Sequence, residues 1–193
     1  MVIPGKPHLE IRKLEQGDLG KLEDFLHECA RLNLENNRDL TAIKFDKMSM
    51  PYGQYFIGLD HTANKIWNLA GIHQLPELGN NVWRALFRGA QLPGYALAFG
   101  KDFLKISYHF RYFLPMQIEF IKSQNPSAEF VISTNVKNAG AGKSDRLNKS
   151  VCPYLKGKGI LTLEWENYML FNTVQNIWKV DTTELTNQLR PLS

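Results

Sequence analysis

Hydrophobic and polar residues follow two different periods along the 193-residue chain, and these periods predict strands and helices in turn. Residues 8–15 alternate with the two-residue period of a half-buried strand. Apolar residues then recur every three or four positions from Leu19 to Leu32, which predicts a helix capped by Asp18. We expect a second, short helix over residues 38–48.

The middle of the chain is rich in the β-branched and aromatic residues that favour strands. Residues 55–57 and 66–69, separated by polar turn residues, predict a hairpin. Residues 82–90 follow a second turn and predict a third strand. We therefore expect a meander of three antiparallel strands.

A long stretch with a helical pattern, residues 95–124, follows the meander. Proline in a helix interior removes a hydrogen-bond donor and clashes with the preceding turn. Pro115 therefore predicts two helices that meet near residues 107–113.

The last third of the chain predicts one buried strand and a closing hairpin. Residues 130–134 form a short apolar run, which we expect inside the sheet. A helix should end near the glycines of residues 157–159. Residues 160–180 predict a hairpin that turns at residues 166–167, and the polar tail after Asp181 should be loosely held.

This order of elements predicts a single α/β (α+β) domain over residues 1–193, with a mixed, mostly antiparallel central sheet flanked by helices. The longest apolar runs are far shorter than the ~20 residues of a membrane span. The N-terminus shows no secretory signal, so we expect a cytoplasmic protein without membrane contact. Cys29 and Cys152 are too few for a zinc site or a disulfide framework, and we expect buried free thiols and no metal.

A net charge of +4 allows attraction to nucleic acid, phosphate or a nucleotide cofactor without choosing among them. Basic and aromatic residues do mix in the third strand and the following helices. In a strand, however, Trp83 and Phe87 share one face while Arg84 and Arg88 share the other. This pattern favours a core face backed by a polar face, and makes nucleic-acid binding the less favoured interpretation.

The segment between the third strand of the meander and the next helix reads Gln91, Leu92, Pro93, Gly94, Tyr95 and Ala96. A strand that leads into a helix start presents backbone N–H groups without intrahelical partners, and the helix dipole adds positive potential, so this place suits a pyrophosphate. Gly94 would let the backbone approach the phosphate oxygens, and the small Ala96 would leave them room. The alternative is that Pro93 and Gly94 only form a turn that closes the strand.

With this segment in this place, the order of elements resembles the GNAT-type N-acetyltransferase superfamily. In that family the loop after the fourth strand reads Gln or Arg, two residues, Gly, one residue, then Gly or Ala. The resemblance implies a GNAT-like acyl-CoA N-acyltransferase fold over nearly the whole chain. It also implies acetyl-CoA, or another acyl-CoA, as co-substrate, held by Gln91, Leu92, Gly94, Tyr95 and Ala96. The pantetheine arm would then lie in an opening between two splayed strands.

The resemblance suggests further site residues beyond this loop. Family members often carry an asparagine shortly after the fifth strand, and either Asn135 or Asn138 stands in that place. Members also often place a tyrosine in the next helix, four residues before a glycine, where its hydroxyl protonates the departing thiolate. Tyr154 is the candidate, although it precedes Gly157 by three residues and Gly159 by five. A packing role is the alternative for Tyr154.

Acyl transfer also needs a base that takes a proton from the attacking ammonium. Glu77 is our candidate, with His73 and His61 as further residues of suitable chemistry on the meander. Ser133 and Ser150 lack the Gly-x-Ser-x-Gly pattern of a serine hydrolase.

The resemblance implies an N-acyltransferase that passes an acyl group to a small-molecule or peptide amine. The alternative hypothesis is a non-catalytic binding or structural protein with the same fold, which the imperfect tyrosine and glycine spacing favours. The helical insertion around residues 95–124 leaves three interpretations open: a substrate lid, an oligomer surface such as that of a homodimer, or a rebuilt cofactor groove.

Overall fold

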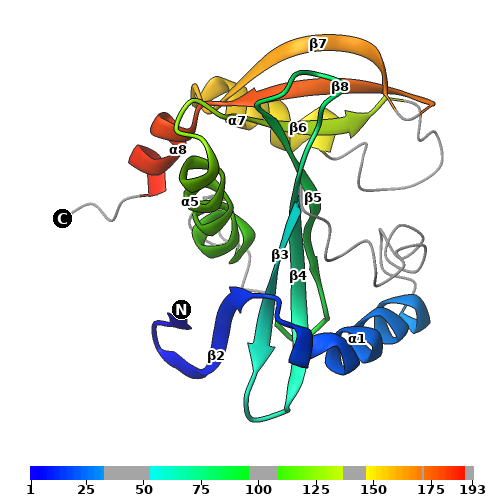
Figure 1. Cartoon of the computed structure of the whole chain (residues 1–193), viewed down its shortest axis with the longest axis vertical. Coiled ribbons are helices and arrows are strands. Elements are labelled where there is room, and N and C mark those ends of the chain that lie inside the picture. Colours follow the sequence, from blue (N-terminus) through cyan, green and yellow to red (C-terminus); the bar gives the residue numbers. More distant parts are fainter. Residues whose placement is uncertain (33–52, 96–107, 137–146, 171, 190–193) are drawn as a thin grey trace. The chain divides into compact units, whose positions relative to one another are not determined.

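The computed structural model describes residues 1–32, 53–95, 108–136, 147–170 and 172–189 (Figure 1). Eight strands form one sheet in the order β1-β2-β3-β4-β5-β6-β8-β7, which confirms the predicted α/β class with a mostly antiparallel sheet. The chain divides into unit 1, Met1–His73 and Leu86–Gln117, and unit 2, Gln74–Ala85 and Ile118–Ser193. The expectation of a single domain stays a prediction.

Unit 1 is built on antiparallel strands, as the alternation of residues 8–15 and the aromatic hairpin predicted. Leu9 of β2 lies opposite Asp60 of β3, and Tyr55 of β3 lies opposite Gly71 of β4. The Leu92 N–H donates to the Trp67 carbonyl at 2.9 Å, where the chain leaving β5 runs beside β4. The strands are β1 (Val2–Ile3), β2 (Lys6–Lys13), β3 (Gly53–Asp60), β4 (Lys65–Gln74) and the second half of β5 (Val82–Gln91).

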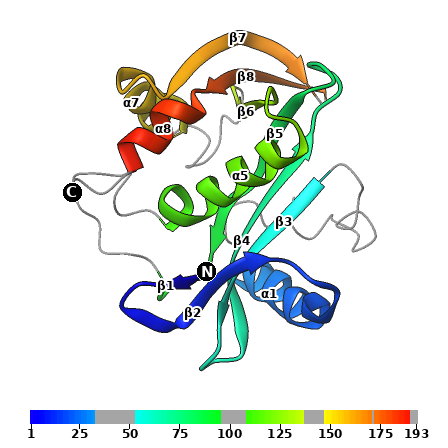
Figure 2. The same cartoon turned by 60° about the vertical axis from the view of Figure 1, so that its left-hand side comes forward.

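Helix α1 (Leu19–Arg31) covers β3 and β4 within unit 1 (Figure 2). Its apolar stripe is buried, as the three- and four-residue spacing predicted, and packs on strand residues including Ile57, Ile66 and Leu69. Asp18, however, does not cap the helix with its side chain. Its carboxylate instead accepts two hydrogen bonds of 2.7 Å from the Arg12 guanidinium and one of 2.9 Å from the Glu15 N–H. The Arg12 guanidinium of β2, and not the amides of α1, therefore donates to the Asp18 carboxylate.

Pro115 lies within one continuous helical segment, and the predicted helix before residue 107 lies outside the described residues, so the meeting of two helices near residues 107–113 stays a prediction. A π-helical turn, His109–Phe113, leads directly into α5 (Leu114–Gln124), so that the proline is the second residue of α5. Proline has no N–H to donate to the preceding turn, and the turn before Pro115 is π-helical, which is a common irregularity where the α-helical hydrogen-bond pattern is interrupted. Residues 96–107 and the predicted helix over 38–48 lie outside the described residues.

Unit 2 contains the parallel part of the sheet. Strand β6 (Glu129–Asn135) lies between β5 and β8 (Thr173–Val180), which confirms the predicted interior strand. The described β5–β6 ladder consists of three pairs, Val82↔Glu129, Trp83↔Phe130 and Arg84↔Val131, although both strands continue further. The other elements are a π-helical turn (Leu147–Val151), α7 (Cys152–Gly157), β7 (Leu161–Leu170) and α8 (Thr182–Leu189).

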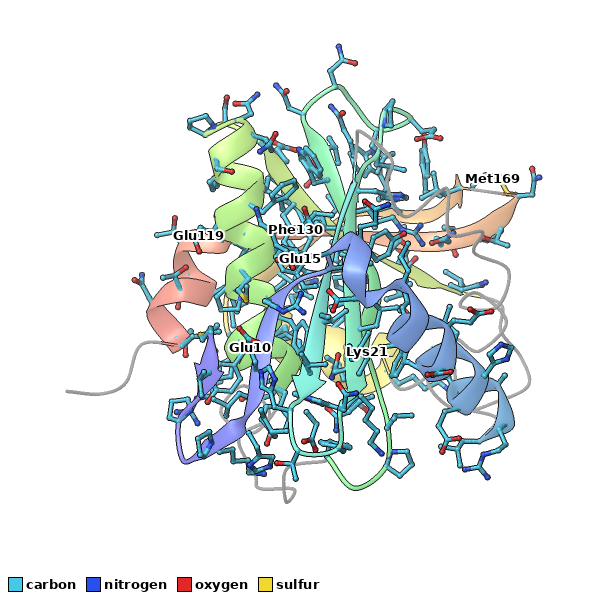
Figure 3. The ribbon with its side chains drawn as sticks, turned by 60° about the horizontal axis from the view of Figure 1, so that its bottom comes forward. Glu10, Glu15, Lys21, Glu119, Phe130 and Met169 are labelled. Atoms are coloured by element: carbon cyan, nitrogen blue, oxygen red, sulfur yellow. The ribbon has the colours of Figure 1, made fainter. Side chains whose placement is uncertain are left out.

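The closing hairpin turns later than predicted. Strand β7 runs through residues 166–167, and Met169 lies near the tip of the β7–β8 hairpin (Figure 3). Asn167 has a φ of +55°, and the register shifts between Trp165 and Tyr168, so this place is a bulge. Asparagine tolerates positive φ in bulges and in turns alike, and the sequence alone does not separate the two.

Residues 182–189 of the polar tail after Asp181 form α8, so the expectation of a loosely held tail was wrong for these residues. The Asp181 carboxylate accepts hydrogen bonds from the N–H groups of Thr183 and Glu184, at 2.9 and 2.8 Å, and caps α8. Leu185 is fully buried and docks this helix. Two apolar residues, Leu185 and Leu189, were too weak a periodic signal to predict it.

Both cysteines are buried thiols that form no disulfide, as predicted. Burial, with a smaller contribution from Glu28, raises the pKa of the Cys29 thiol to about 11. None of the helices within the described ranges is long and apolar enough to cross a lipid bilayer.

Candidate functional site

The turn that follows β5 has the backbone shape that only glycine adopts without strain. Pro93 and Gly94 occupy its corner, both exposed, and Gly94 has a φ of +90°. Proline followed by a glycine at positive φ is the pattern of a type II turn. A Cβ atom on Gly94 would meet no described atom within 4 Å, so backbone conformation and not crowding requires the glycine.

The residues before this corner are tied to the sheet. The Leu92 side chain is buried, and its N–H donates to the Trp67 carbonyl at 2.9 Å. The Gln91 side-chain oxygen accepts from Asn68 at 3.2 Å. Because Pro93 has no N–H, the turn leaves two amides, those of Gly94 and Tyr95, without a hydrogen-bond acceptor in the described part of the chain.

Tyr95, at the far side of the corner, turns its side chain back onto β3 and β4. Its ring stacks on Trp67, with centroids 5.3 Å apart and 13° between the planes. Its hydroxyl donates to Asp60 Oδ2 at 2.7 Å, and the Lys65 ammonium lies 5.6 Å from the ring centroid. Burial and the Asp60 carboxylate raise the pKa of Tyr95 to about 12.

Asp60 is itself held by the β3–β4 turn. Its Oδ1 accepts from the N–H groups of Thr62 and Ala63, both at 2.9 Å. Burial by itself raises the pKa of this carboxyl, but the hydrogen bonds from Ala63, Tyr95 and Thr62 outweigh it, so the pKa lies below its usual value. Asp60 is therefore ionised at neutral pH. The sequence pattern indicated Asp60 only as one of the polar turn residues between residues 57 and 66.

A cavity of about 240 Å³ opens in unit 1 beside Leu92. Its wall contains apolar groups of α1, β4 and the chain after β5, and its charged groups are two ammoniums and two carboxylates. These charges cancel, and neither Gly94 nor Tyr95 is among the described residues that line the cavity. Lys21 of α1 is labelled in Figure 3. The lining residues are Lys21, Asp24, Phe25, Glu28, Asn64, Lys65, Ile66 and Leu92.

In unit 2, the predicted Asn135 lies at the end of β6 within a hydrogen-bonded chain. Its carbonyl accepts from Asn148 at 2.8 Å, and Asn148 Oδ1 lies 2.5 Å from the buried Thr134 hydroxyl. The Trp178 indole donates to the same hydroxyl at 3.0 Å. The turn before α7 is thereby fixed to the end of β6. No sequence pattern indicated Asn148, and Asn138 lies outside the described residues.

The two predicted catalytic residues also belong to unit 2. Tyr154 is half-buried on α7, with the Lys158 ammonium 5.8 Å from its ring centroid. Glu77 is exposed in the turn between β4 and β5. No contact between described residues joins these two side chains. Of the other candidate bases, His61 lies 3.0 Å from a Glu10 carboxylate oxygen, and His73 is half-buried at the end of β4.

Three of the aromatic residues considered as a nucleic-acid surface are part of the core, and the side chain of Phe87 lies outside the described part of the chain. Trp83, Tyr108 and Tyr112 are buried, and Arg84 donates to the Ser133 hydroxyl at 2.6 Å. Buried rings cannot stack on bases, which supports the core interpretation. Over the described residues, no group of three or more histidine, cysteine, aspartate or glutamate side chains gathers as a metal site.

No family model and no curated protein sequence matches the chain. Solved structures do match it, over most of its length. A GNAT-family acetyltransferase from Staphylococcus aureus Mu50 matches with a TM-score of 0.53 at 13% identity, covering 89% of this chain and 98% of that chain. Spermidine N-acetyltransferase from Vibrio cholerae, in complex with CoA and spermine, matches with a TM-score of 0.53 at 13% identity. The match covers 93% of this chain and 99% of that chain. The chain has the GNAT acetyltransferase fold.

A further GNAT acetyltransferase, the ribosomal-protein-S5-alanine acetyltransferase from Vibrio fischeri, matches with a TM-score of 0.51 at 12% identity, covering 91% of this chain and 94% of that chain. At such identities the chain is a divergent example of the GNAT fold. The Gly94 turn directly follows β5, and residues 96–107 after it lie outside the described part of the chain.

Proposed function

We propose that this protein is an N-acyltransferase that binds acetyl-CoA, or another acyl-CoA, at the Gly94 turn and passes the acyl group to an amine. The GNAT fold supports the reaction class, because the similar structures are acetyltransferases and one of them contains CoA. The observation that carries the proposal is the exposed Gly94 turn, whose two amides have no acceptor in the described chain. Such amides are suitable donors to a diphosphate.

The reaction needs little from side chains. The amine nitrogen attacks the thioester carbonyl carbon, the C–N bond forms, and the C–S bond breaks as the thiolate leaves. Positioning of the two substrates and backbone donors to the oxyanion supply most of the catalysis. In this proposal Glu77 takes the proton from the attacking ammonium, and Tyr154 gives one to the departing thiolate. In addition to the Gly94 turn, Gln91, Ala96 and Asn135 are candidate contacts to the acyl-CoA.

The acceptor class is a primary amine on a small molecule or a peptide. Among the similar structures, one enzyme is named for spermidine and another for a ribosomal-protein alanine. Two free cysteines fit a reducing cytoplasm, which we include in the proposal together with homodimer formation through the insertion.

A thermal-shift titration with acetyl-CoA and with free CoA tests the binding step. A ligand that binds only the native state adds about 2.7 kcal/mol of stability at one hundred times its Kd. We expect the Tm to rise with both ligands, and absence of a shift with either would overturn the proposal. Release of free CoA thiol in the presence of a panel of amines then tests the transfer step.

The non-catalytic alternative rests on the spacing of Tyr154 to the following glycines, of which Gly159 has a φ of +73° and ends the turn after α7. A protein of this kind would show the same thermal shift with CoA. It would release no thiol with any amine of the panel, whereas an N-acyltransferase would release thiol with at least one.

A further inference from the structure

We propose that Tyr95 and Asp60 are positioning residues for acyl-CoA, because their hydrogen bond holds the Gly94 turn in the shape that binds the diphosphate. The inference rests on the proposed function and adds to it a side-chain pair that lies outside the amide-bearing turn. Neither residue needs to touch the ligand with its side chain. Both act through the backbone of the corner.

The turn is fastened on both sides to the same tryptophan. Before the corner, the Leu92 N–H donates to the Trp67 carbonyl. After the corner, the Tyr95 ring lies flat on the Trp67 indole. Trp67 itself has no exposed surface, so it is a fixed support. Only Pro93 and Gly94 lie between these two attachments, so the direction of the Gly94 and Tyr95 amides depends on both.

Stacking alone would let the Tyr95 ring slide or rotate on the indole. The hydroxyl bond to Asp60 removes that freedom, since the Asp60 carboxylate is buried and is also held by the Thr62 and Ala63 amides. A hydrogen bond to an ionised acceptor is stronger than one between neutral groups. The second attachment of the turn is therefore directional.

A preformed turn matters because glycine has the largest backbone freedom to lose. If the turn were mobile, binding of the diphosphate would have to order Gly94, and affinity would fall by that entropy. A turn that already holds its positive φ avoids the loss. The pair thus contributes to ligand affinity without adding a ligand contact, and its removal should weaken acyl-CoA binding while the folded core persists.

The test compares two tyrosines that contact the same indole. Tyr95→Phe removes the hydroxyl that reaches Asp60 and keeps the stacked ring. Tyr108→Phe removes a buried hydroxyl that has no partner in the described part of the chain, from a ring 5.0 Å from Trp67. By calorimetry, we expect the Kd for CoA to rise about tenfold in Tyr95→Phe and to stay unchanged in Tyr108→Phe.

A double-mutant cycle with Asp60→Asn shows whether the two residues act as a unit. We expect Asp60→Asn to weaken CoA binding by a similar factor, and the double variant to bind no more weakly than either single variant. In turnover, KM for acyl-CoA should rise while kcat at saturation stays the same. A purely structural role would lower the Tm of the variants and leave the Kd of the folded protein unchanged.

The outcomes separate this inference from the function on which it rests. Wild-type protein that binds CoA, with Tyr95→Phe and Asp60→Asn binding within about threefold of it, would overturn the positioning role and leave the proposed function standing. Additive effects of the two substitutions on the Kd would show that Tyr95 and Asp60 act independently, which would also overturn the positioning role of the pair. Wild-type protein that binds no CoA would overturn both.

Discussion

Gly58 lies directly under the indole of Trp67, so closely that a Cβ atom on Gly58 would sit 2.5 Å from the indole Cε2 atom. Real Cβ atoms do not approach another atom to that distance. The missing side chain lets β3 pass beneath the Trp67 ring. The ring then stacks against Tyr95, and the backbone carbonyl of Trp67 accepts the hydrogen bond from the Leu92 N–H. A glycine far from the turn in sequence thereby helps to set its geometry.

Gly58→Ala should destabilise the protein by about 1–3 kcal/mol, since the buried indole has no room to move and the core is overpacked. Urea denaturation measures the change. The matched control is Gly20→Ala on the exposed side of α1, where a Cβ meets no described atom within 4 Å. That substitution should stabilise by about 0.5–1 kcal/mol through helix propensity. Equal stabilities of the two variants would contradict the tight approach of β3.

Gly94→Glu should abolish most CoA binding, because it places a carboxylate where the diphosphate would lie. We expect the Kd for CoA to rise about tenfold to hundredfold, measured by calorimetry. Gly5→Glu is the control, since Gly5 also belongs to unit 1, has a φ of +74° and has open space around it. Both variants carry the strain of about 1–3 kcal/mol expected of an L-residue at positive φ. If both lose the same CoA affinity, strain and not the phosphate site is responsible.

The free energy of unfolding of Arg12→Gln should fall less than that of wild type when the pH is lowered into the acid range. The hydrogen bonds from Arg12, opposed by burial, hold the pKa of the Asp18 carboxyl below its ordinary 3.8. A lowered carboxyl pKa contributes stability above the unfolded-state value, and that stability is lost as pH falls through the folded-state value. Wild type should therefore exceed Arg12→Gln by about 1.5–3 kcal/mol at pH 7, and the gap should close as Asp18 becomes protonated.

The control for this pair is Arg31→Gln. Arg31 binds Glu28 with two hydrogen bonds of 2.8 and 2.7 Å, nearly the lengths of the Arg12–Asp18 pair, but on the surface of α1. Exposed pairs contribute little, because water solvates both partners. Urea denaturation between pH 2 and pH 7 should show almost no change for this variant. A pH-independent gap between wild type and Arg12→Gln would contradict the role assigned to Asp18.

Tyr154→Phe should lower kcat by about a hundredfold and leave KM for acyl-CoA unchanged, if the hydroxyl protonates the departing thiolate. Tyr168→Phe, on a half-buried tyrosine of β7 in the same unit, should leave kcat unchanged. Steady-state thiol release measures both. A normal kcat in Tyr154→Phe would return Tyr154 to a packing role and require another proton donor.

Local periodicity was sufficient for the elements that carry several apolar residues. Helix α1 was predicted because its apolar positions repeat along its own length, and strand β6 because it contains a short continuous apolar run. Helix α8 was not, since Leu185 is its one fully buried residue and its cap is an aspartate in a polar stretch. The bulge at Asn167 was mistaken for the hairpin turn, because positive φ is common to both.

By itself, the sequence determined where the chain turns after β5, since proline followed by glycine restricts the backbone whatever surrounds it. It also determined the order of strands and helices, which sufficed for the resemblance to the GNAT fold. Only the tertiary structure decided that the Leu92 amide belongs to the sheet and that Tyr95 is bound to Asp60. Those partners lie 25 and 35 positions away along the chain, and no local pattern encodes a hydrogen bond that forms only when distant strands meet.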